Sequence, residues 1–281
     1  MSTTVFFAVI LAALLHAGWN AVVKSGLDKR AAMGAVVLGH LPFALVLVPL
    51  VPFPRIESLP YILAGIVLHV GYQLSLMRSY QLGDLTQVYP IARGVAPLIV
   101  ALLSVTLLGL HLSALALVAI AVISTGILSL GLVRRADGQR NAPAAFFALT
   151  TGCFIAGYSL VDGLGARVAG TALGFLAWLT IGNALFMVLY FRTVTPGVLG
   201  VIITKGRRTM LLGGGASFLA YGIVMWAFTQ APIALVTALR ETSIIFALII
   251  GVAVLKEPLN LLKVLATMLT LTGAFLLRFA R

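Results

Sequence analysis

Ten apolar runs, each about as long as a bilayer is thick, follow one another along this sequence. They fall at about 4–23, 32–52, 59–80, 85–108, 112–132, 144–163, 169–191, 210–229, 233–255 and 259–277. An α-helix needs roughly 20 such residues to cross the hydrocarbon core. Lipid offers no partner to an open backbone, and the runs lack the strict alternation of barrel strands. The sequence therefore predicts an all-α polytopic membrane protein with ten transmembrane helices.

The composition supports the same class and excludes others. Hydrophobic residues make up 61% of the chain and charged residues only 9%, whereas soluble domains carry about 25% charged residues. The net charge of +12 does not indicate nucleic-acid binding, because most Lys and Arg fall in short loops and no reader motif is present. Cys153 is the only cysteine, which excludes a disulfide framework. We expect no metal, no cofactor and no enzymatic activity.

The two halves of the chain resemble each other. The polar stretch at 133–143 separates a first unit of five helices, residues 1–135, from a second, residues 143–281, with 136–142 as the connecting loop. At an offset of 147 residues, 240 minus 93, Arg93 falls on Arg240, and Thr125-Gly126 falls on Thr272-Gly273. At another offset, "AGWN" (17–20) matches "AGYS" (156–159). Because five is odd, the second unit must enter the membrane in the opposite sense, which makes an inverted repeat.

An inverted repeat has consequences for both mechanism and orientation. Such chains bind substrate near the midplane between the repeats and alternate access by rocking one against the other. Lys and Arg concentrate in cytoplasmic loops. On the side of the termini we count four basic residues, and on the other side ten: Lys29, Arg30, Arg134, Arg135, Arg140, Arg192, Lys205, Arg207, Arg208 and Lys256. We therefore expect the second side to be cytoplasmic, both termini to lie on the opposite side of the membrane, and the first run to be retained as a span.

Three charged residues lie deep within apolar runs. Arg93, Arg240 and Glu241 are each about nine residues into a run, roughly 13 Å at 1.5 Å per residue and so near mid-bilayer. A charge there costs on the order of 3 kcal/mol unless it is paired or faces water. Arg240 and Glu241 point about 100° apart on a helix, so Glu241 is expected to meet Arg93 or Lys263. Two roles stay open: an ion-pair latch between the units, and direct contact with substrate.

The helix that carries Arg93 also contains two prolines. Pro90 and Pro97 each remove a backbone N–H and are expected to bend the helix as hinge residues. Irregular backbone at membrane depth is tolerated only beside protein or water. We therefore expect Arg93 to face a cavity.

Polar and aromatic residues form stripes along several predicted helices. His16, Trp19 and Asn20 recur at helical spacing, as do His69, Tyr72 and Gln73; Tyr158 precedes Asp162 by one turn, and Tyr221 follows Ser217. Interfacial anchoring would also explain Trp19, and hydrogen bonds between helices would explain Asn20, Ser217 and His40. The candidate cavity and substrate-binding residues are His16, Trp19, Asn20, His69, Tyr72, Gln73, Tyr89, Arg93, Tyr158, Tyr221, Arg240 and Glu241.

Longer motifs carry a resemblance to a known family. Three segments are "GDLTQVYPIARGVAPLIVALL" (83–103), "ALVTALRETSIIFALIIGVAVLKEPLN" (234–260) and "TLTG" (270–273). Together with the pattern of five helices plus five, they resemble the EamA branch of the drug/metabolite transporter superfamily. Within it the chain is most similar to YddG-type exporters of aromatic and other amino acids. The resemblance implies export of small metabolites by alternating access, with substrate held between the units.

The expected function is therefore export of amino acids, aromatic or otherwise apolar, and related small metabolites. Aromatic residues would enclose the side chain of the substrate, and Arg93 or Arg240 could attract its carboxylate. The expected partners are this substrate and the lipid bilayer, with the protein acting as a monomer. Small four-helix relatives exchange protons through a glutamate in the first helix, which this chain lacks; facilitated movement and proton coupling through histidine both stay open.

Three other functions stay open beside amino-acid export. They are export of other metabolites or cationic drugs, an intramembrane hydrolase with a serine in "GGGASF" (213–218), and a sensor or assembly factor that transports nothing. The hydrolase lacks the glycine that follows the nucleophile in a sharp elbow.

Overall fold

Every regular element in the described part of the chain is a helix. The computed structural model describes residues 1–281 except 24–27, 83–84, 132–141, 254–260 and 281. The α-helices are α1 (Thr3–Val23), α2 (Lys29–Gly39), α3 (Leu41–Leu47), α4 (Leu59–Leu82), α5 (Leu85–Thr106), α6 (Ala114–Gly131), α7 (Ala142–Val168), α8 (Ala172–Thr193), α9 (Val198–Lys205), α10 (Gly215–Gln230), α11 (Ile233–Arg240), α12 (Ser243–Ala253) and α13 (Leu261–Phe279). Short 3₁₀ turns, η1 (Val48–Leu50) and η2 (Ile56–Ser58), and a π-helical turn, η3 (Thr209–Gly214), complete the set.

The chain is an all-α polytopic membrane protein. Within the described ranges, seven helical stretches are long and apolar enough to cross a bilayer: Thr3–Asn20, Arg30–Leu50, Ile56–Leu82, Ala142–Val168, Ala172–Thr193, Thr209–Gln230 and Ile233–Ala253. Shorter apolar helices cover Pro90–Thr106, Ala114–Ser129 and Val264–Phe279. The larger number of ten spans and the inverted repeat stay predictions.

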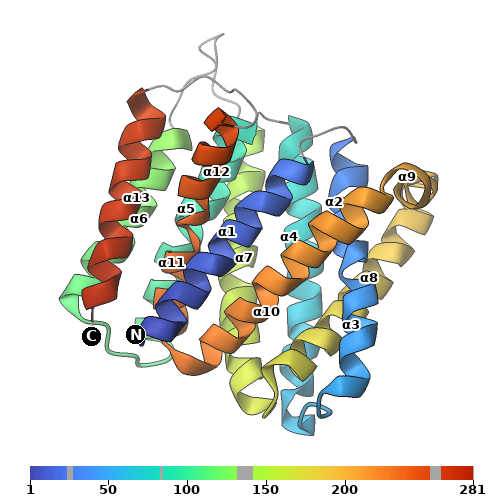
Figure 1. Ribbon diagram of the computed structural model, residues 1–281, viewed down its shortest axis with the longest axis horizontal. Helices are drawn as coiled ribbons and strands as arrows, with labels where there is room; N and C mark the ends of the chain where they lie inside the picture. Colours follow the sequence, from blue (N-terminus) through green and yellow to red (C-terminus); the bar gives the residue numbers. More distant parts are fainter. Residues whose placement is uncertain (24–27, 83–84, 132–141, 254–260, 281) are drawn as a thin grey trace.

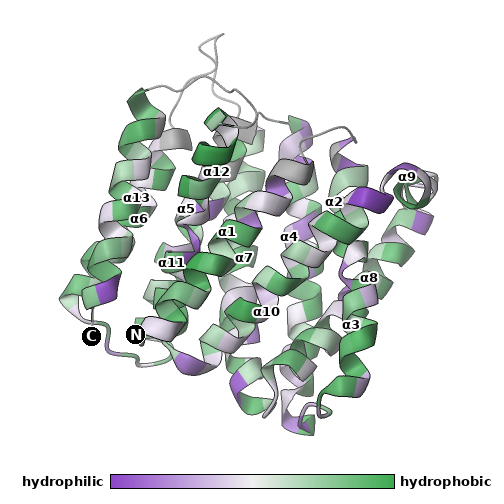
Figure 2. Cartoon of the chain, in the orientation of Figure 1, coloured by the Kyte–Doolittle hydropathy of each residue, from purple (hydrophilic) through white to green (hydrophobic). Residues whose placement is uncertain are grey.

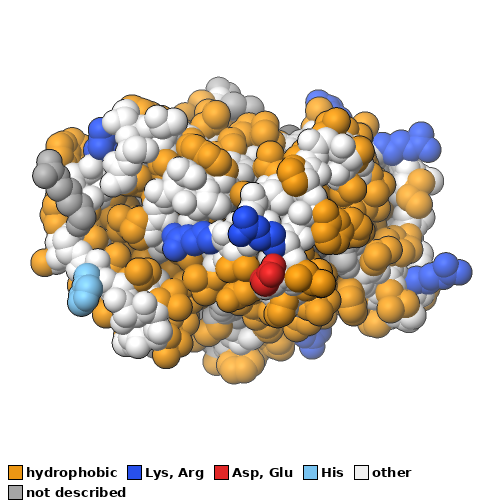
Figure 3. Space-filling view, turned by 90° about the horizontal axis from the view of Figure 1, so that it is seen from below, with side chains coloured by type: hydrophobic (Ala, Val, Ile, Leu, Met, Phe, Trp, Pro, Cys, Tyr) orange, Lys and Arg blue, Asp and Glu red, His pale blue; other side chains and the backbone are white. Residues whose placement is uncertain are grey.

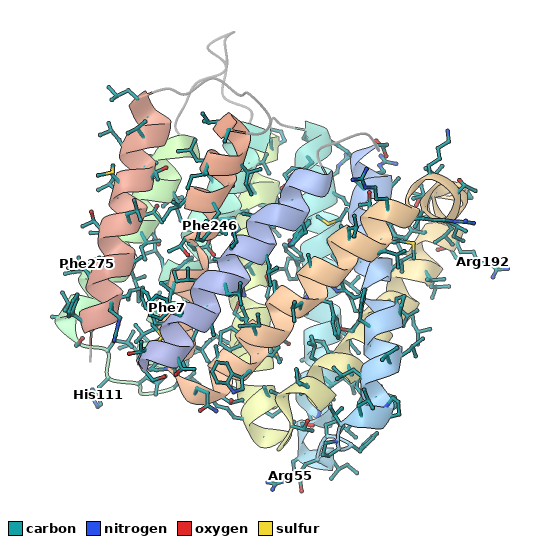
Figure 4. All side chains as sticks on the ribbon, in the orientation of Figure 1. Phe7, Arg55, His111, Arg192, Phe246 and Phe275 are labelled. Atoms are coloured by element: carbon teal, nitrogen blue, oxygen red, sulfur yellow. The ribbon has the colours of Figure 1, made fainter. Side chains whose placement is uncertain are left out.

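The outer surface of the bundle is apolar. Hydrophobic residues dominate the helices along their whole length (Figure 2). Phe7 and Phe275 extend from the outer helices (Figure 4), and each is 63% exposed. Leu185 on α8 is exposed to the same extent. Lipid solvates such side chains, whereas water would favour their burial.

Helices far apart in the sequence pack side by side (Figure 1). Both chain ends lie at the same end of the bundle. Helix α1 crosses the front and packs against α10 and α12, while α4 and α7 pack together behind it. Helix α13 packs against α6 at one side, and α9 lies at the other side. The lower end of the bundle carries a group of charged side chains among hydrophobic ones (Figure 3).

The interruptions of the helices differ from those expected. Helix α5 continues through both Pro90 and Pro97, so the hinge expected there is not a break in the helix. The break lies between α11 and α12, where the N–H of Glu241 donates to Ala238 O at 3.1 Å and the Thr242 hydroxyl to Leu239 O at 2.8 Å. These short-range bonds satisfy carbonyls at the end of α11 and let the chain change direction within the bundle.

Two other segments also depart from the expected pattern. The run at 32–52 divides into α2 and α3 at His40. The connection between the apolar runs at 169–191 and 210–229 contains α9, which begins after Gly197 with φ of +95°. Glycine adopts this left-handed conformation without strain, and the apolar segment that follows forms two helical turns.

Candidate functional site

A cavity of about 100 Å³ lies in the interior of the bundle. Its wall is contributed by α1, α2, α4, α7, α8, α10 and α11, with His40 at the junction of α2 and α3. Eight of the twelve expected cavity and substrate residues line it: His16, Trp19, His69, Tyr72, Gln73, Tyr158, Tyr221 and Arg240. The structure thus brings together residues from four of the predicted stripes.

Aromatic rings form one continuous part of the cavity wall. His69 stacks on Tyr158 with 4.2 Å between ring centroids. Tyr72 and Tyr221 each meet Tyr158 edge to face, at 5.5 Å and 6.2 Å. Such rings present large apolar faces and a few polar atoms. The wall can therefore enclose an apolar or aromatic group.

Asp162 joins three of the helices that hold these rings. Its side chain is fully buried on α7, and its Oδ2 lies 2.7 Å from Nε2 of His69 on α4. The Tyr221 hydroxyl on α10 donates to the same oxygen at 2.5 Å. Asp162 therefore holds His69 and Tyr221 in position without lining the cavity itself.

Gly65 makes the room that this carboxyl group needs. A Cβ at Gly65 would lie 2.6 Å from Asp162 Oδ1 and 2.8 Å from a methyl group of Leu179. Oδ1 has no hydrogen-bond partner among the described residues. A side chain at position 65 would thus displace the carboxyl group and the two residues bound to it.

The contact from Tyr221 to Asp162 gives a first testable prediction. Tyr221→Phe removes one buried donor from the carboxyl group and should lower the free energy of unfolding by about 1–3 kcal/mol. Thermal unfolding of the purified protein in detergent measures the change. Tyr190→Phe is the matched control, because the Tyr190 hydroxyl binds nothing in the described part of the chain. Equal midpoints for the two variants would contradict this role for Tyr221.

His16 connects α1 to α5. Trp19 Nε1 donates to His16 Nδ1 at 3.2 Å, and Arg93 NH1 lies 3.4 Å from His16 Nε2. A neutral imidazole accepts at only one nitrogen, so His16 accepts from one of these two donors at a time. The Asn20 side chain donates to the backbone oxygen of His16 at 2.7 Å and does not line the cavity.

Arg93 and Glu241 form a buried ion pair instead of facing the cavity. Arg93 Nε lies 2.8 Å from Glu241 Oε2, with side chains 6% and 0% exposed. Arg93 also donates to Ser243 Oγ at 3.3 Å. The prediction that Glu241 meets Arg93 is confirmed, and the side chain of Lys263, the other cation considered, lies outside the description. Arg93, which was expected to face a cavity, is not among the residues that line this one; its guanidinium lies against Glu241, Ser243 and His16.

Arg240 has a different environment. It lines the cavity and is 6% exposed, and its NH1 has no hydrogen-bond partner in the described ranges. Its guanidinium carbon lies 5.9 Å from the centroid of the Tyr221 ring. A cation over an aromatic face gains a modest attraction, but this does not replace an anion.

Other polar residues of the wall were missed or given a lesser role by the sequence analysis. Asn183 and Thr180 on α8 line the cavity, and so does His40, which was interpreted as a packing residue. A single amide within an otherwise apolar run, as in "WLTIGNALF" (178–186), is the signal that could have indicated Asn183. The side chain of Tyr89 lies outside the described residues, so its predicted place in the cavity is not tested.

The chain is similar in fold to a protein of known structure. A solved structure described only as the crystal structure of a protein superimposes with a TM-score of 0.75 and 18% sequence identity, over 98% of the present chain and 96% of its own. At this identity the likeness concerns the fold alone. Neither a protein-family model nor a curated protein matches the chain.

Proposed function

We propose that this protein is a membrane transporter that exports amino acids, in particular aromatic and other apolar ones, and related small metabolites by alternating access. The observation that carries the proposal is the interior cavity, whose wall combines the rings of Tyr72, Tyr158 and Tyr221 with buried polar groups. Ligand sites of this kind are concave, largely apolar and provided with a few placed polar groups.

The size of the cavity favours a small substrate. Its volume of about 100 Å³ is somewhat smaller than the ~150 Å³ of an engineered cavity that binds benzene. A cavity on this scale suits a small molecule. A large multi-ring drug would need a wider cavity.

The proposal includes two inverted five-helix units, residues 1–135 and 143–281, with ten spans in all. Under this topology the cavity lies between the units, since α1, α2 and α4 belong to the first and α7, α8, α10 and α11 to the second. His69–Asp162 and Arg93–Glu241 then both join one unit to the other. Rocking of the units would act on these pairs, as alternating access between repeats requires.

Membership of the EamA branch of the drug/metabolite transporters, near the YddG-type exporters, is part of the same proposal. The resemblance of the segments at 83–103 and 234–260 supports it. The protein would lie in the bacterial inner membrane as a monomer, with both termini periplasmic. Movement would be facilitated or coupled to protons through histidine, and His16, His40 and His69 all line the cavity.

Transport in liposomes tests the proposed function. We expect purified protein in liposomes to give saturable counterflow of labelled phenylalanine, tyrosine or leucine, and none in empty liposomes. The panel should include an organic cation and be repeated with an imposed pH gradient, since dependence on the gradient separates proton coupling from facilitated movement. Absence of saturable flux for every amino acid would refute amino-acid transport.

A further inference from the structure

The two deep arginines of this protein are in opposite electrostatic situations. Arg93 has a carboxylate partner, Glu241, at 2.8 Å. Arg240 is buried to a similar degree, yet within the described residues it has neither an ion pair nor a hydrogen bond from NH1. A guanidinium never loses its charge in a protein. Within the described residues the charge of Arg240 therefore has no direct ion-pair partner, which leaves its guanidinium open to water or to a bound anion.

The position of Arg240 directs that charge into the cavity. It is the last residue of α11, where the helix ends within the bundle. The described residues that line the cavity include no Asp or Glu, and Arg240 is the only one of them with a permanent charge. Asp162 and Glu241 are both fully buried and already bound, to His69 and Tyr221 and to Arg93. Glu241 acts electrostatically on both arginines, but no carboxylate among the described residues of the cavity wall contacts the guanidinium of Arg240.

We propose that Arg240 binds the carboxylate of the substrate, and that the transported class is small carboxylates bearing an apolar or aromatic group. The inference rests on the proposed transport function and gives it a recognition group. A guanidinium pairs with a carboxylate through charge-assisted hydrogen bonds, and the Tyr221 ring beneath Arg240 provides a face for the rest of the ligand. Arg93 then has a structural role, since its charge is already neutralised.

The same cavity can accommodate the ammonium group of an amino acid. The side-chain oxygens of Gln73 on α4 and Asn183 on α8 are buried, line the cavity and lack partners in the described part of the chain. Such oxygens accept hydrogen bonds from an ammonium group. They carry no charge, so they do not compensate Arg240. A cation without a carboxylate would be repelled by Arg240, whereas a zwitterion satisfies both kinds of group.

Competition between an acid and its amide tests the role of Arg240. Purified protein in detergent is titrated with labelled phenylalanine, and unlabelled phenylalanine and phenylalaninamide are compared as competitors. The two ligands share a ring and an ammonium group and differ in the carboxylate. We expect the amide to bind at least about tenfold more weakly, the effect of losing a hydrogen-bonded charge pair. Counterflow in liposomes should give the same order.

Variants of the two arginines make the test specific. Arg240→Gln should weaken phenylalanine binding by about tenfold or more and remove the preference for acid over amide. Arg240→Lys, which keeps the charge, should retain part of that preference. The double variant R93Q/E241Q lacks the buried ion pair but keeps Arg240, so it should still bind phenylalanine more tightly than phenylalaninamide. Arg78→Gln is the outer control, since Arg78 is exposed on α4 and bound to Gln81.

The possible outcomes separate this inference from the proposed function. Equal binding of phenylalanine and its amide by the wild-type protein would overturn the role of Arg240 and leave transport intact, and this comparison needs no variant to fold. An unchanged preference in Arg240→Gln would also overturn it. Failure of the wild type to bind or move any member of the amino-acid panel would refute the proposed function itself.

Discussion

Glu241→Gln is expected to lower the free energy of unfolding by about 3–5 kcal/mol, because the substitution leaves Arg93 charged and buried without its carboxylate. Arg93 Nε lies 2.8 Å from Glu241 Oε2, and neither side chain has appreciable access to solvent. The neutral amide can still accept one hydrogen bond but cannot compensate the charge. Thermal unfolding in detergent should show a lower midpoint, and the yield of monodisperse protein should fall.

The double variant R93M/E241M is the control for this prediction. Removing both charges together leaves no uncompensated ion, and replacing a buried pair by apolar residues of similar volume is often neutral or stabilising. The double variant should therefore be more stable than Glu241→Gln. A single variant as stable as the wild type would show that the pair contributes nothing, and a double variant worse than the single would show that packing matters more than charge.

Gly39→Ala should destabilise the protein by about 3 kcal/mol, the upper part of the range for overpacking. A Cβ at position 39 would collide with the carbonyl oxygen of Met210 and lie 2.9 Å from its Cα, both in η3. Gly214 approaches the backbone of Gly39 just as closely, with its own Cβ position 2.7 Å from the Gly39 Cα. Backbone cannot rotate away as a side chain can, so α2 and η3 must separate.

Gly18→Ala is the matched control for Gly39→Ala. Nothing lies within 4 Å of a Cβ at Gly18 on α1, and alanine is the better helix former by about 1 kcal/mol. This variant should be as stable as the wild type or more so, measured by the same unfolding assay. Similar losses in both variants would mean that the close approach of α2 to η3 is not the cause.

The local patterns in the sequence predicted the positions of the helices well and the positions of their interruptions poorly. Pro90 and Pro97 predicted a bend in this helix, and α5 continues through both without a break. No proline or glycine in the sequence indicates the break at Glu241 and Thr242. It depends on short-range bonds and on the partner that Glu241 finds on α5.

The candidate site, like the helices, could be predicted only in part from local sequence patterns. The stripes of His69, Tyr72 and Gln73 on α4 were identified from helical spacing, and all three line the cavity. The polar wall on α8 was not identified, because Asn183 and Thr180 stand alone among apolar neighbours and form no stripe. A cavity residue contributed singly by a helix can be assigned only when the neighbouring helices are in place.

The sequence by itself determined that this is a membrane protein, and it predicts how deep the charged residues lie. Hydropathy and run length are properties of a continuous segment, so they predict a depth near mid-membrane for Arg93, Arg240 and Glu241 without knowledge of any partner. Only the tertiary structure decided which arginine is neutralised and which faces the cavity. That choice depends on distances of a few ångströms between helices far apart in the chain, and Coulomb interactions and hydrogen bonds at such distances are not encoded in any local pattern.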